Sequence, residues 1–296
     1  MQPMPTLAAL VTFYHGTDAT ELRRALDSLA AQTRPAEEVL IIQDGPAPAA
    51  AVDVAREFAH RTPGARLVSL PTNQGSGPAL AAGIAGTEAD LVAVLDSDDV
   101  AAPERFAVQL DFFAAHPEVD VVGSSLREFD QEVARTTGSL EKAAAATGNA
   151  IRSLPEEHAD IARYARINSP VNHPTAMMRR ATVVAAGGYQ PVAFLEDYDL
   201  WARILARGGR FHNLAQPLTW FAVSPAQRKR RSSFAMIRGE WAFQRRLISY
   251  GLITRGRGVL NFVLRNAYRL LPRPAVRLAY SLLFHRRAES TTDRAA

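Results

Sequence analysis

The chain contains no cysteine among its 296 residues. This absence excludes a disulfide scaffold, a thiolate metal site and a cysteine nucleophile. Oxygen and imidazole groups remain as metal ligands, and they suit hard cations such as Mg²⁺ or Mn²⁺. No apolar run approaches the roughly 18–20 residues that a membrane-spanning helix needs. The first six residues also lack a basic stretch ahead of an apolar one, so they do not resemble a signal peptide and we expect a cytoplasmic protein.

Acidic residues are almost absent from residues 228–287. Fifteen of the 34 basic residues lie between Arg228 and Arg287, but only one of the 30 acidic residues, Glu240, lies there. A basic segment of this kind needs a partner, and nucleic acid, anionic lipid and a phosphate-bearing acceptor are the candidates. Over residues 236–287 arginines alternate with Leu, Phe, Tyr and Val, which predicts basic amphipathic helices in a membrane interface. Ordinary helices packed on the domain are the alternative.

Short apolar runs alternate with helical patterns in the first hundred residues. Strands are predicted at 7–13, 38–43, 65–70 and 91–95, and helices at 19–32, 50–60 and 78–86. This alternation predicts an α/β fold with a mostly parallel central sheet flanked by helices. Further along, helices are predicted at 105–115, 161–167, 181–187 and 197–207, strands at 119–123 and 218–223, and basic helices at 238–249 and 259–284. The stretch 128–153 is polar and alanine-rich and carries no clear pattern.

Four polar residues follow the apolar strand 91–95. They are Asp96, Ser97, Asp98 and Asp99. In parallel α/β sheets ligands bind beyond the carboxyl ends of strands. Three carboxylates packed there repel one another unless a cation neutralises them, and a divalent metal bridging a diphosphate would do so. The alternative is a solvated turn that caps the next helix.

The ends of two other strands carry candidate nucleoside contacts. Tyr14 offers a stacking face beside Thr12, and Asp44 can accept hydrogen bonds from a base or ribose, although Asp44-Gly45 is also a common turn. The loop from Asn73 to Gly77 includes Gly75 and opens a helix, so its backbone can approach a ligand closely. A structural turn explains this loop equally well, because the dinucleotide-binding fingerprint is incomplete.

A second acidic pair begins the predicted helix 197–207. Glu196 and Asp197 either cap this helix, or one of them acts as a general base that deprotonates a sugar hydroxyl. A single base fits one-step displacement with inversion, and the sequence offers no separate nucleophile with a paired base. Upstream, His173 either contacts metal or acceptor or lies in the core. The basic run ending in Arg230 and Arg231 either holds phosphate groups or is a solvated loop.

These segments together resemble the family 2 glycosyltransferases, in particular a subgroup related to amylovoran biosynthesis enzymes that make exopolysaccharide. The matching stretches lie in the expected order between about residues 7 and 250. They are SLAAQTRPAEE (28–38), QDGP (43–46), NQGSGPALAA (73–82), LDSDD (95–99), PERFAVQLDFFAAHPEVDVVG (103–123), NSPVNHPTAM (168–177), GGY (187–189), EDYDLWAR (196–203) and the pair 230–231. The combination is far more specific than any one motif.

The resemblance implies the GT-A fold of nucleotide-diphospho-sugar transferases. It implies a nucleotide-sugar-binding half at 1–125, an acceptor-binding and catalytic-base half at 126–227, and a basic helical extension at 228–296. Asp98, helped by Asp96, would then meet Mg²⁺ or Mn²⁺ and the donor diphosphate. The remaining donor contacts would come from Thr12, Tyr14, Asp44, Asn73, Gly75 and Ser97. Asp197 would be the base, and acceptor or phosphate contacts would come from Glu196, His173, Trp201, Arg230 and Arg231.

The expected reaction is therefore transfer of a sugar, with UDP-hexose favoured, to a lipid-linked or growing polysaccharide acceptor in a bacterial cell envelope. The expected place is the inner face of the plasma membrane, with the basic helices on anionic lipid. The sequence departs from the family pattern at His15-Gly16, Ala82 and Ala93-Val94, which leaves the donor sugar and the nucleotide open.

Three other functions are weaker matches to the sequence. A sugar-1-phosphate nucleotidyltransferase needs a glycine-rich basic loop after the first strand, which the segment 14–17 lacks. An inactive scaffold that binds membrane and partner enzymes would not need both Asp98 and Asp197. No nucleic-acid partner is expected, because the basic tail contains no recognition module.

Overall fold

The computed structural model describes residues 5–192, 195–224 and 234–270, except for the side chains of 234–238 and 267–270. The strands are β1 (Leu7–Phe13), β2 (Glu38–Asp44), β3 (Ala65–Leu70), β4 (Leu91–Asp96), β5 (Val100–Ala101), β6 (Val121–Asp130), β7 (Ile151–Arg152), β8 (Met177–Arg179) and β9 (Phe211–Val223). The helices are α1 (Ala19–Ala30), α2 (Ala49–Arg61), α3 (Ser76–Ala85), α4 (Arg105–Ala115), α5 (Gln131–Thr137), α6 (Leu140–Ala146), α7 (His158–Tyr164), α8 (Arg180–Ala185), α9 (Glu196–Ala206), α11 (Phe234–Ser249) and α12 (Arg255–Leu270), with a 3₁₀ turn, η1 (His173–Thr175).

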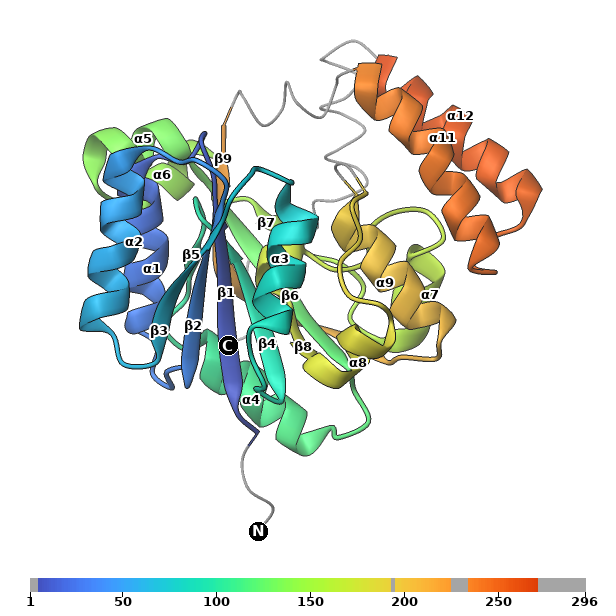
Figure 1. Cartoon of the computed structure of the whole chain (residues 1–296). Helices are drawn as coiled ribbons and strands as arrows, with labels where there is room; N and C mark the ends of the chain where they lie inside the picture. The colour runs from blue at the N-terminus through green and yellow to red at the C-terminus, as the bar shows by residue number, and fades with distance from the viewer. Residues whose placement is uncertain (1–4, 193–194, 225–233, 271–296) are drawn as a thin grey trace, which may run out of the picture.

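The strands form one sheet in the order β3-β2-β1-β4-β8-β6-β9-β5, and β7 pairs with β6 beside this path (Figure 1). The pairs β3–β2, β2–β1, β1–β4 and β6–β9 are parallel. The short strand β8 lies antiparallel between β4 and β6 and so joins the two parallel parts. The prediction of a mostly parallel α/β sheet is therefore confirmed.

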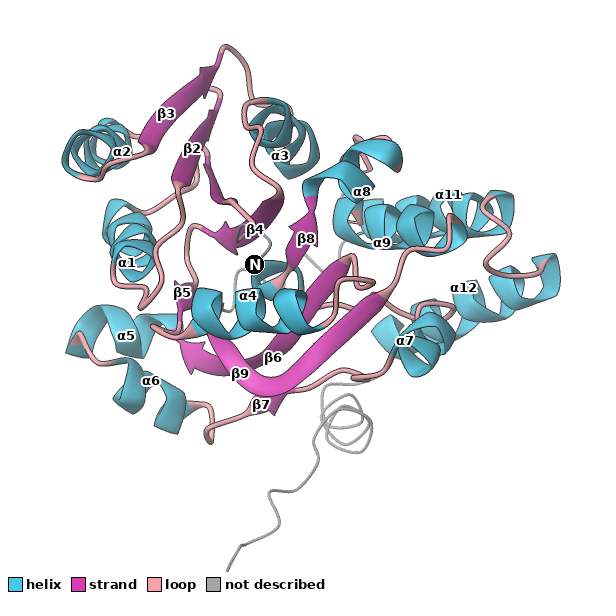
Figure 2. Ribbon diagram, turned by 90° about the horizontal axis from the view of Figure 1, so that it is seen from below, coloured by secondary structure: helices cyan, strands magenta, loops and turns pink. Residues whose placement is uncertain are grey.

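Helices cover both faces of this sheet, as Figure 2 shows. Side chains alternate between the faces of a strand. In β1, Leu7, Ala9, Val11 and Phe13 pack with α1, α2 and α4, while Ala8 and Leu10 pack with α3, α8 and α9. Because both faces of the central strands are buried, these strands are continuous apolar runs in the sequence.

The two strands β6 and β9 are longer than the sequence predicts. The strand predicted at 119–123 continues to Asp130, and the one predicted at 218–223 begins at Phe211. The two strands pair over most of their length, with register shifts around Ser125, which lies opposite Pro217. Buried polar residues such as Ser124 and Asn213 interrupt the apolar pattern, so the sequence shows only one end of each strand.

The unassigned stretch 128–153 contains the end of β6, the short helices α5 and α6, and β7. Asp130 caps α5 by accepting from two backbone amides, and Gly138 ends that helix at a φ of 66°. Ala134, Ala143 and Ala144 pack against Phe129 in a small cluster of their own. Alanine here serves close packing of short helices against the end of the long strands.

The C-terminal helices α11 and α12 pack beside α9, where Phe243 and Leu247 meet Tyr198 and Ala202. They overlap the basic helices predicted at 238–249 and 259–284, although residues 271–284 lie outside the described residues. No helix in the described ranges is both long and apolar enough to span a membrane. The division into 1–125, 126–227 and 228–296 stays a prediction.

Candidate active site

The carboxyl ends of β1, β2 and β4 meet at one edge of the sheet. Thr12 is in register with Ile42 on one side and with Asp96 on the other, so the ends of all three strands lie side by side. Tyr14 follows β1 and is 37% exposed. Its backbone N–H donates to the Thr17 hydroxyl at 3.0 Å, which shapes the turn. The aromatic ring is therefore available at this edge for stacking.

Asp44 lies at the end of β2 and is buried. Its two carboxylate oxygens accept from the backbone N–H groups of Gln74, at 2.8 Å, and Gly75, at 2.9 Å. The Asn73 side chain donates in return to the Asp44 carbonyl at 3.2 Å. Gly75, at a φ of 92°, then starts α3. The sequence analysis placed Asp44 against the nucleoside, and the structure adds that this carboxylate also fixes the loop before α3.

The three acids after β4 have different surroundings. The Asp96 side chain is 43% exposed, whereas Asp99 is fully buried and accepts from the backbone N–H of Ala222 at 2.8 Å. Burial, and then the charges of Asp98 and Asp96, raise the pKa of Asp99 well above its usual value. Its second oxygen has no hydrogen-bond partner within the described part of the chain. Asp96 and Asp98, both partly exposed like Ser97, are therefore the acids placed to meet a ligand.

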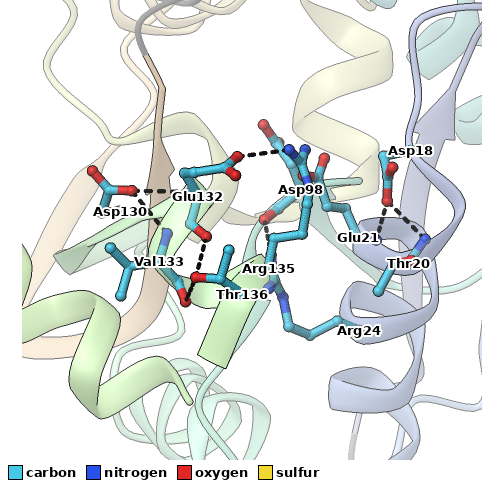
Figure 3. Close-up of polar contacts among 10 residues, drawn as sticks. All are labelled: Asp18, Thr20, Glu21, Arg24, Asp98, Asp130, Glu132, Val133, Arg135 and Thr136. Carbon is cyan, nitrogen blue, oxygen red and sulfur yellow. Dashed lines mark hydrogen bonds and ion pairs between the residues drawn. The ribbon is translucent and has the colours of Figure 1, made fainter. Parts of the chain in front are cut away.

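Residues of helices α1 and α5 lie next to the turn that contains Asp98 (Figure 3). Arg24 of α1 donates to the backbone carbonyl of Asp98 at 3.4 Å. Arg135 of α5 forms an ion pair with Glu21 of α1 at 3.0 Å. The first contact ties α1 to the turn after β4, and the second ties α5 to α1. A small cavity lined by Asp18, Glu21, Arg24 and Arg135 lies between the two helices.

Arg105 connects the acidic turn to η1. The guanidinium is fully buried, and its Nη2 donates to the carbonyls of Val94, at 2.9 Å, and Ala176, at 3.3 Å. Its Nε donates to Gln109, whose amide in turn donates to the Thr175 carbonyl at 2.8 Å. Burial lowers the pKa of Arg105 to about 9. Arg105 was not predicted as a site residue, because nothing in an amphipathic helix marks one arginine as fully buried.

His173, at the start of η1, lies against the site and not in an isolated core position. Its Nδ1 is 3.6 Å from an Asp96 carboxylate oxygen, and its Nε2 is 3.0 Å from the Tyr189 hydroxyl. Burial opposes the charged ring, but the close contact with the Asp96 carboxylate and the negative charges of Asp197 and Glu196 together raise the pKa of His173. The imidazole therefore connects the acid after β4 to the second acidic pair.

The start of α9 lies beside the start of α3. The Ser76 hydroxyl donates to the Glu196 carboxylate, and a Cβ on Gly77 would lie 2.7 Å from the Gln190 carbonyl oxygen and 3.3 Å from the Glu196 Cβ. Glycine at position 77 thus allows the two helix N-termini to approach. The Ser169 hydroxyl donates to Asp197 at 3.4 Å. Burial, and then the charge of Asp197, raise the pKa of Glu196.

Tyr189 is the second residue that the sequence analysis missed as a site residue. Its ring is buried, and burial followed by the fields of Asp197, Glu196 and Asp96 raise its pKa well above the usual value. The tyrosine therefore stays protonated and lies among three carboxylates from β4 and α9. The GGY stretch at 187–189 was the only sequence signal for it.

Three further residues were predicted to contact the acceptor or its phosphate, namely Trp201, Arg230 and Arg231. Trp201 has no exposed surface and packs edge-on against Phe211, with ring centroids 6.1 Å apart. An acceptor does not reach such a side chain, so the prediction of direct contact is corrected, and Trp201 instead packs 6.4 Å from the His173 ring. Arg230 and Arg231 lie outside the described residues.

The donor set at the acidic turn fits Mg²⁺ or Mn²⁺. The described residues contain no group of three or more His, Asp or Glu side chains arranged to hold a metal unaided. Magnesium usually binds through one or two carboxylates, with substrate phosphates and water completing its shell. Asp96 and Asp98, two partly exposed oxygen ligands beyond a strand end, match that requirement.

Comparison with known proteins gives consistent matches. The family model described as glycosyl transferase family 2 matches residues 9–187. Amylovoran biosynthesis glycosyltransferase AmsE of Erwinia amylovora is 31% identical over 92% of this chain and 97% of its own length. A UDP-Gal:α-D-GlcNAc-diphosphoundecaprenol β-1,3-galactosyltransferase of Escherichia coli is 28% identical over 90% of this chain and 92% of its own.

Solved structures show the same fold at low sequence identity. Staphylococcus aureus TarS in complex with UDP is 16% identical and has a TM-score of 0.61, covering 94% of this chain and 75% of that one. The mannosyltransferase PcManGT of Pyrobaculum calidifontis, in complex with GDP-Man and Mn²⁺, has a TM-score of 0.60 at 16% identity, covering 95% of this chain and 81% of that one. With the expected GT-A fold confirmed and the family model matching residues 9–187, this chain belongs to glycosyl transferase family 2.

Proposed function

We propose that the protein is an inverting, metal-dependent glycosyltransferase that transfers a hexose from a UDP-sugar to a lipid-linked or growing polysaccharide acceptor. One observation carries the proposal: His173 lies 3.6 Å from the Asp96 carboxylate after β4 and 3.0 Å from the hydroxyl of the buried Tyr189, and the charge of Asp197, at the start of α9, raises the pKa of both side chains. A cation-binding acid and a base thus share one site, where a donor diphosphate and an acceptor hydroxyl can meet.

The donor half of the proposal uses the strand-end residues. Tyr14 stacks on the base, while Thr12 and the loop held by Asp44 line the nucleoside site. Asp96 and Asp98 hold the divalent cation, which when bound neutralises the diphosphate and so favours departure of the nucleotide. The UDP in the TarS complex and the UDP-Gal in the name of the Escherichia coli relative support a uridine nucleotide.

The acceptor half of the proposal uses the start of α9. Asp197 accepts the proton of the acceptor hydroxyl as this oxygen attacks the anomeric carbon. The Ser169 hydroxyl orients Asp197, and Glu196 and His173 line the acceptor side. Because attack and departure occur on opposite faces in one displacement, the anomeric centre inverts. Arg230 and Arg231 are proposed to hold an acceptor phosphate.

We also infer that the reaction serves bacterial cell-surface glycan synthesis at the cytoplasmic side of the plasma membrane. The name of the Erwinia relative includes amylovoran biosynthesis, and that of the Escherichia coli relative includes a diphosphoundecaprenol acceptor. An acceptor of the second kind is anchored in a membrane, so an enzyme acting on it must work at the membrane surface.

The test measures binding and slow hydrolysis of UDP-, GDP- and dTDP-sugars with and without Mn²⁺. The wild type is expected to act on one donor only with metal, and Asp98→Ala is expected to abolish this. Asp197→Asn should retain donor binding by calorimetry and lose transfer by at least roughly a hundredfold, the usual contribution of a general base. Asp53→Asn, the same change at an exposed position of α2, is the matched control and should leave transfer unchanged.

Two results would contradict the proposal. If no nucleotide sugar binds under any condition, the protein is an inactive scaffold and not a transferase. If Asp197→Asn transfers sugar at the wild-type rate, the base is another residue.

A further inference from the structure

The polarity of α12 is inverted relative to that of a helix packed on a protein in water, although α11 buries Phe243 and Leu247 against α9 in the usual way. Glu240, Gln244 and Asn261 are buried between the helices and bond to one another, with Gln244 donating to Glu240 at 2.9 Å and Asn261 donating to Gln244 at 3.2 Å. Arg265 adds an ion pair to Glu240 at 3.3 Å. A water-exposed helix normally buries its apolar stripe and exposes its polar one. Here the polar network lies inside.

The apolar side chains of α12 point outward. Val259, Leu260, Val263 and Leu264 are 50%, 47%, 54% and 58% exposed. At about 100° per residue, these four positions lie within one stripe along the helix. The stripe ends at a groove shared with α11, which Val259 and Trp241 both line. In Figure 1 the two helices lie side by side at the edge of the molecule, away from the sheet.

Exposed arginines accompany this apolar stripe. Arg245 and Arg255 line the groove, and Arg257 is exposed one turn before Leu260. The only acidic residue between 234 and 270 is Glu240, whose side chain is buried and paired. Within residues 234–270 the outer face is therefore apolar and positively charged, without a compensating negative group. A second copy of the same face would bring like charges together, which disfavours self-association.

We propose that the outer face of α11–α12 docks on an anionic lipid bilayer. The four aliphatic side chains of α12 insert at the level of the headgroups and first methylenes, and the arginines at the groove contact lipid phosphates. Interfacial helices bind membranes in this way, with their apolar face buried and basic groups at the surface. The docking rests on the chemistry of this face alone and does not depend on the proposed reaction.

The outer face of α11–α12 is also linked by hydrogen bonds to α9, the helix that carries Asp197. Asp199, two residues after Asp197, is fully buried and accepts from Arg246 of α11 at 2.7 Å and from Tyr250 at 2.9 Å. Behind the stripe, Asn261 donates to the carbonyl of Arg166 at 2.7 Å. Docking therefore holds the acceptor side of the site at one orientation to the membrane.

The experiment is flotation of the full chain with vesicles. One set contains phosphatidylcholine and phosphatidylglycerol in equal amounts, and the other contains phosphatidylcholine alone. The wild type should float with the anionic vesicles only, and less at high salt. Val263→Glu/Leu264→Glu should lower the partition coefficient by roughly tenfold or more, because two inserted aliphatic side chains are lost. Val184→Glu on α8, also an exposed valine, is the matched control and should float as the wild type does.

The altered positions are already exposed, so the double variant should fold, and its Tm should match that of the wild type. The proposal is overturned if the double variant floats like the wild type, or if the wild type floats with neither set or equally with both. Analytical ultracentrifugation provides the remaining outcome: a wild-type dimer that the double variant converts to monomer would make a second copy the occupant of this face.

Discussion

The carboxylate of Asp199 offers the sharpest test of how α11 is held to the catalytic helix. It has no exposed surface and accepts three hydrogen bonds, from Arg203 at 2.8 Å, from Arg246 at 2.7 Å and from Tyr250 at 2.9 Å. Asp199→Ala removes the two oxygens that accept these three bonds and leaves two guanidinium groups without their buried counter-charge. Breaking a buried charged pair from one side costs about 3–5 kcal/mol, so we expect a loss of that size in the free energy of unfolding.

Urea denaturation followed by circular dichroism measures this loss. Arg246→Ala is the companion variant, and because its side chain is 39% exposed, we expect it to cost only about 1 kcal/mol. The double variant should then be nearly as stable as Asp199→Ala alone, since the partner has already gone. If Asp199→Ala cost less than about 1 kcal/mol, the packed contact between α9 and α11 would not depend on this carboxylate, and the reasoning would be wrong.

Three further results are expected. In Asp44→Ala the two backbone amides of the loop before α3 lose the carboxylate that anchors them. The affinity for UDP, measured by calorimetry, should then fall roughly tenfold, while the far-ultraviolet circular dichroism spectrum stays unchanged. Gly45→Ala should lower the free energy of unfolding by about 3 kcal/mol, because φ is 74° and the new Cβ would lie 2.3 Å from the Asn73 nitrogen. Gly138→Ala, at a φ of 66° but with open space around the new Cβ, should lower it by only about 1 kcal/mol in the same urea denaturation. Folding raises the pKa of Glu196, so ionising this residue lowers the stability of the wild type as the pH rises above the ordinary pKa of 4.5. The stability of Glu196→Gln relative to the wild type should therefore be higher at about pH 8 than at about pH 4. An equal stability difference at the two pH values would contradict the direction of the pKa shift.

The first half of the fold could be predicted because each central strand is buried on both faces. Such strands are short apolar runs ended by turn residues, and the predicted limits of β1 match those of the structure. The limits of β3 match as well, although it is a partly exposed edge strand. The long strands β6 and β9 could not be delimited in this way. In these strands Ser124, Ser125 and Asn213 are buried and form hydrogen bonds to distant segments. Sequence periodicity counts such polar residues as exposed.

The acids of the site were visible in the sequence, but their surroundings were not. Asp96 and Glu196 stand out as charges beside apolar segments, and those patterns are local. The contact of Asp96 with His173, and that of Glu196 with Ser76, which is 120 residues away in sequence, exist only after β8 and α9 have packed against the sheet. For the same reason the sequence placed Trp201 with the acceptor contacts, although α9 turns it into the core.

The packing of α9 against α11 has a consequence for the order in which a glycan grows. Tyr198 and Phe243 pack with their rings tilted and their centroids 4.6 Å apart, so α9, which carries Asp197 in its first turn, and the pair α11–α12 form one packed unit. On a docked molecule the height of the base above the lipid is then a constant length. A membrane-tethered acceptor would be extended only when its hydroxyl stands at that height, because displacements of about 1 Å already slow reactions strongly. The enzyme would therefore select acceptors by length, and a chain one sugar too short or too long would be left for a different transferase.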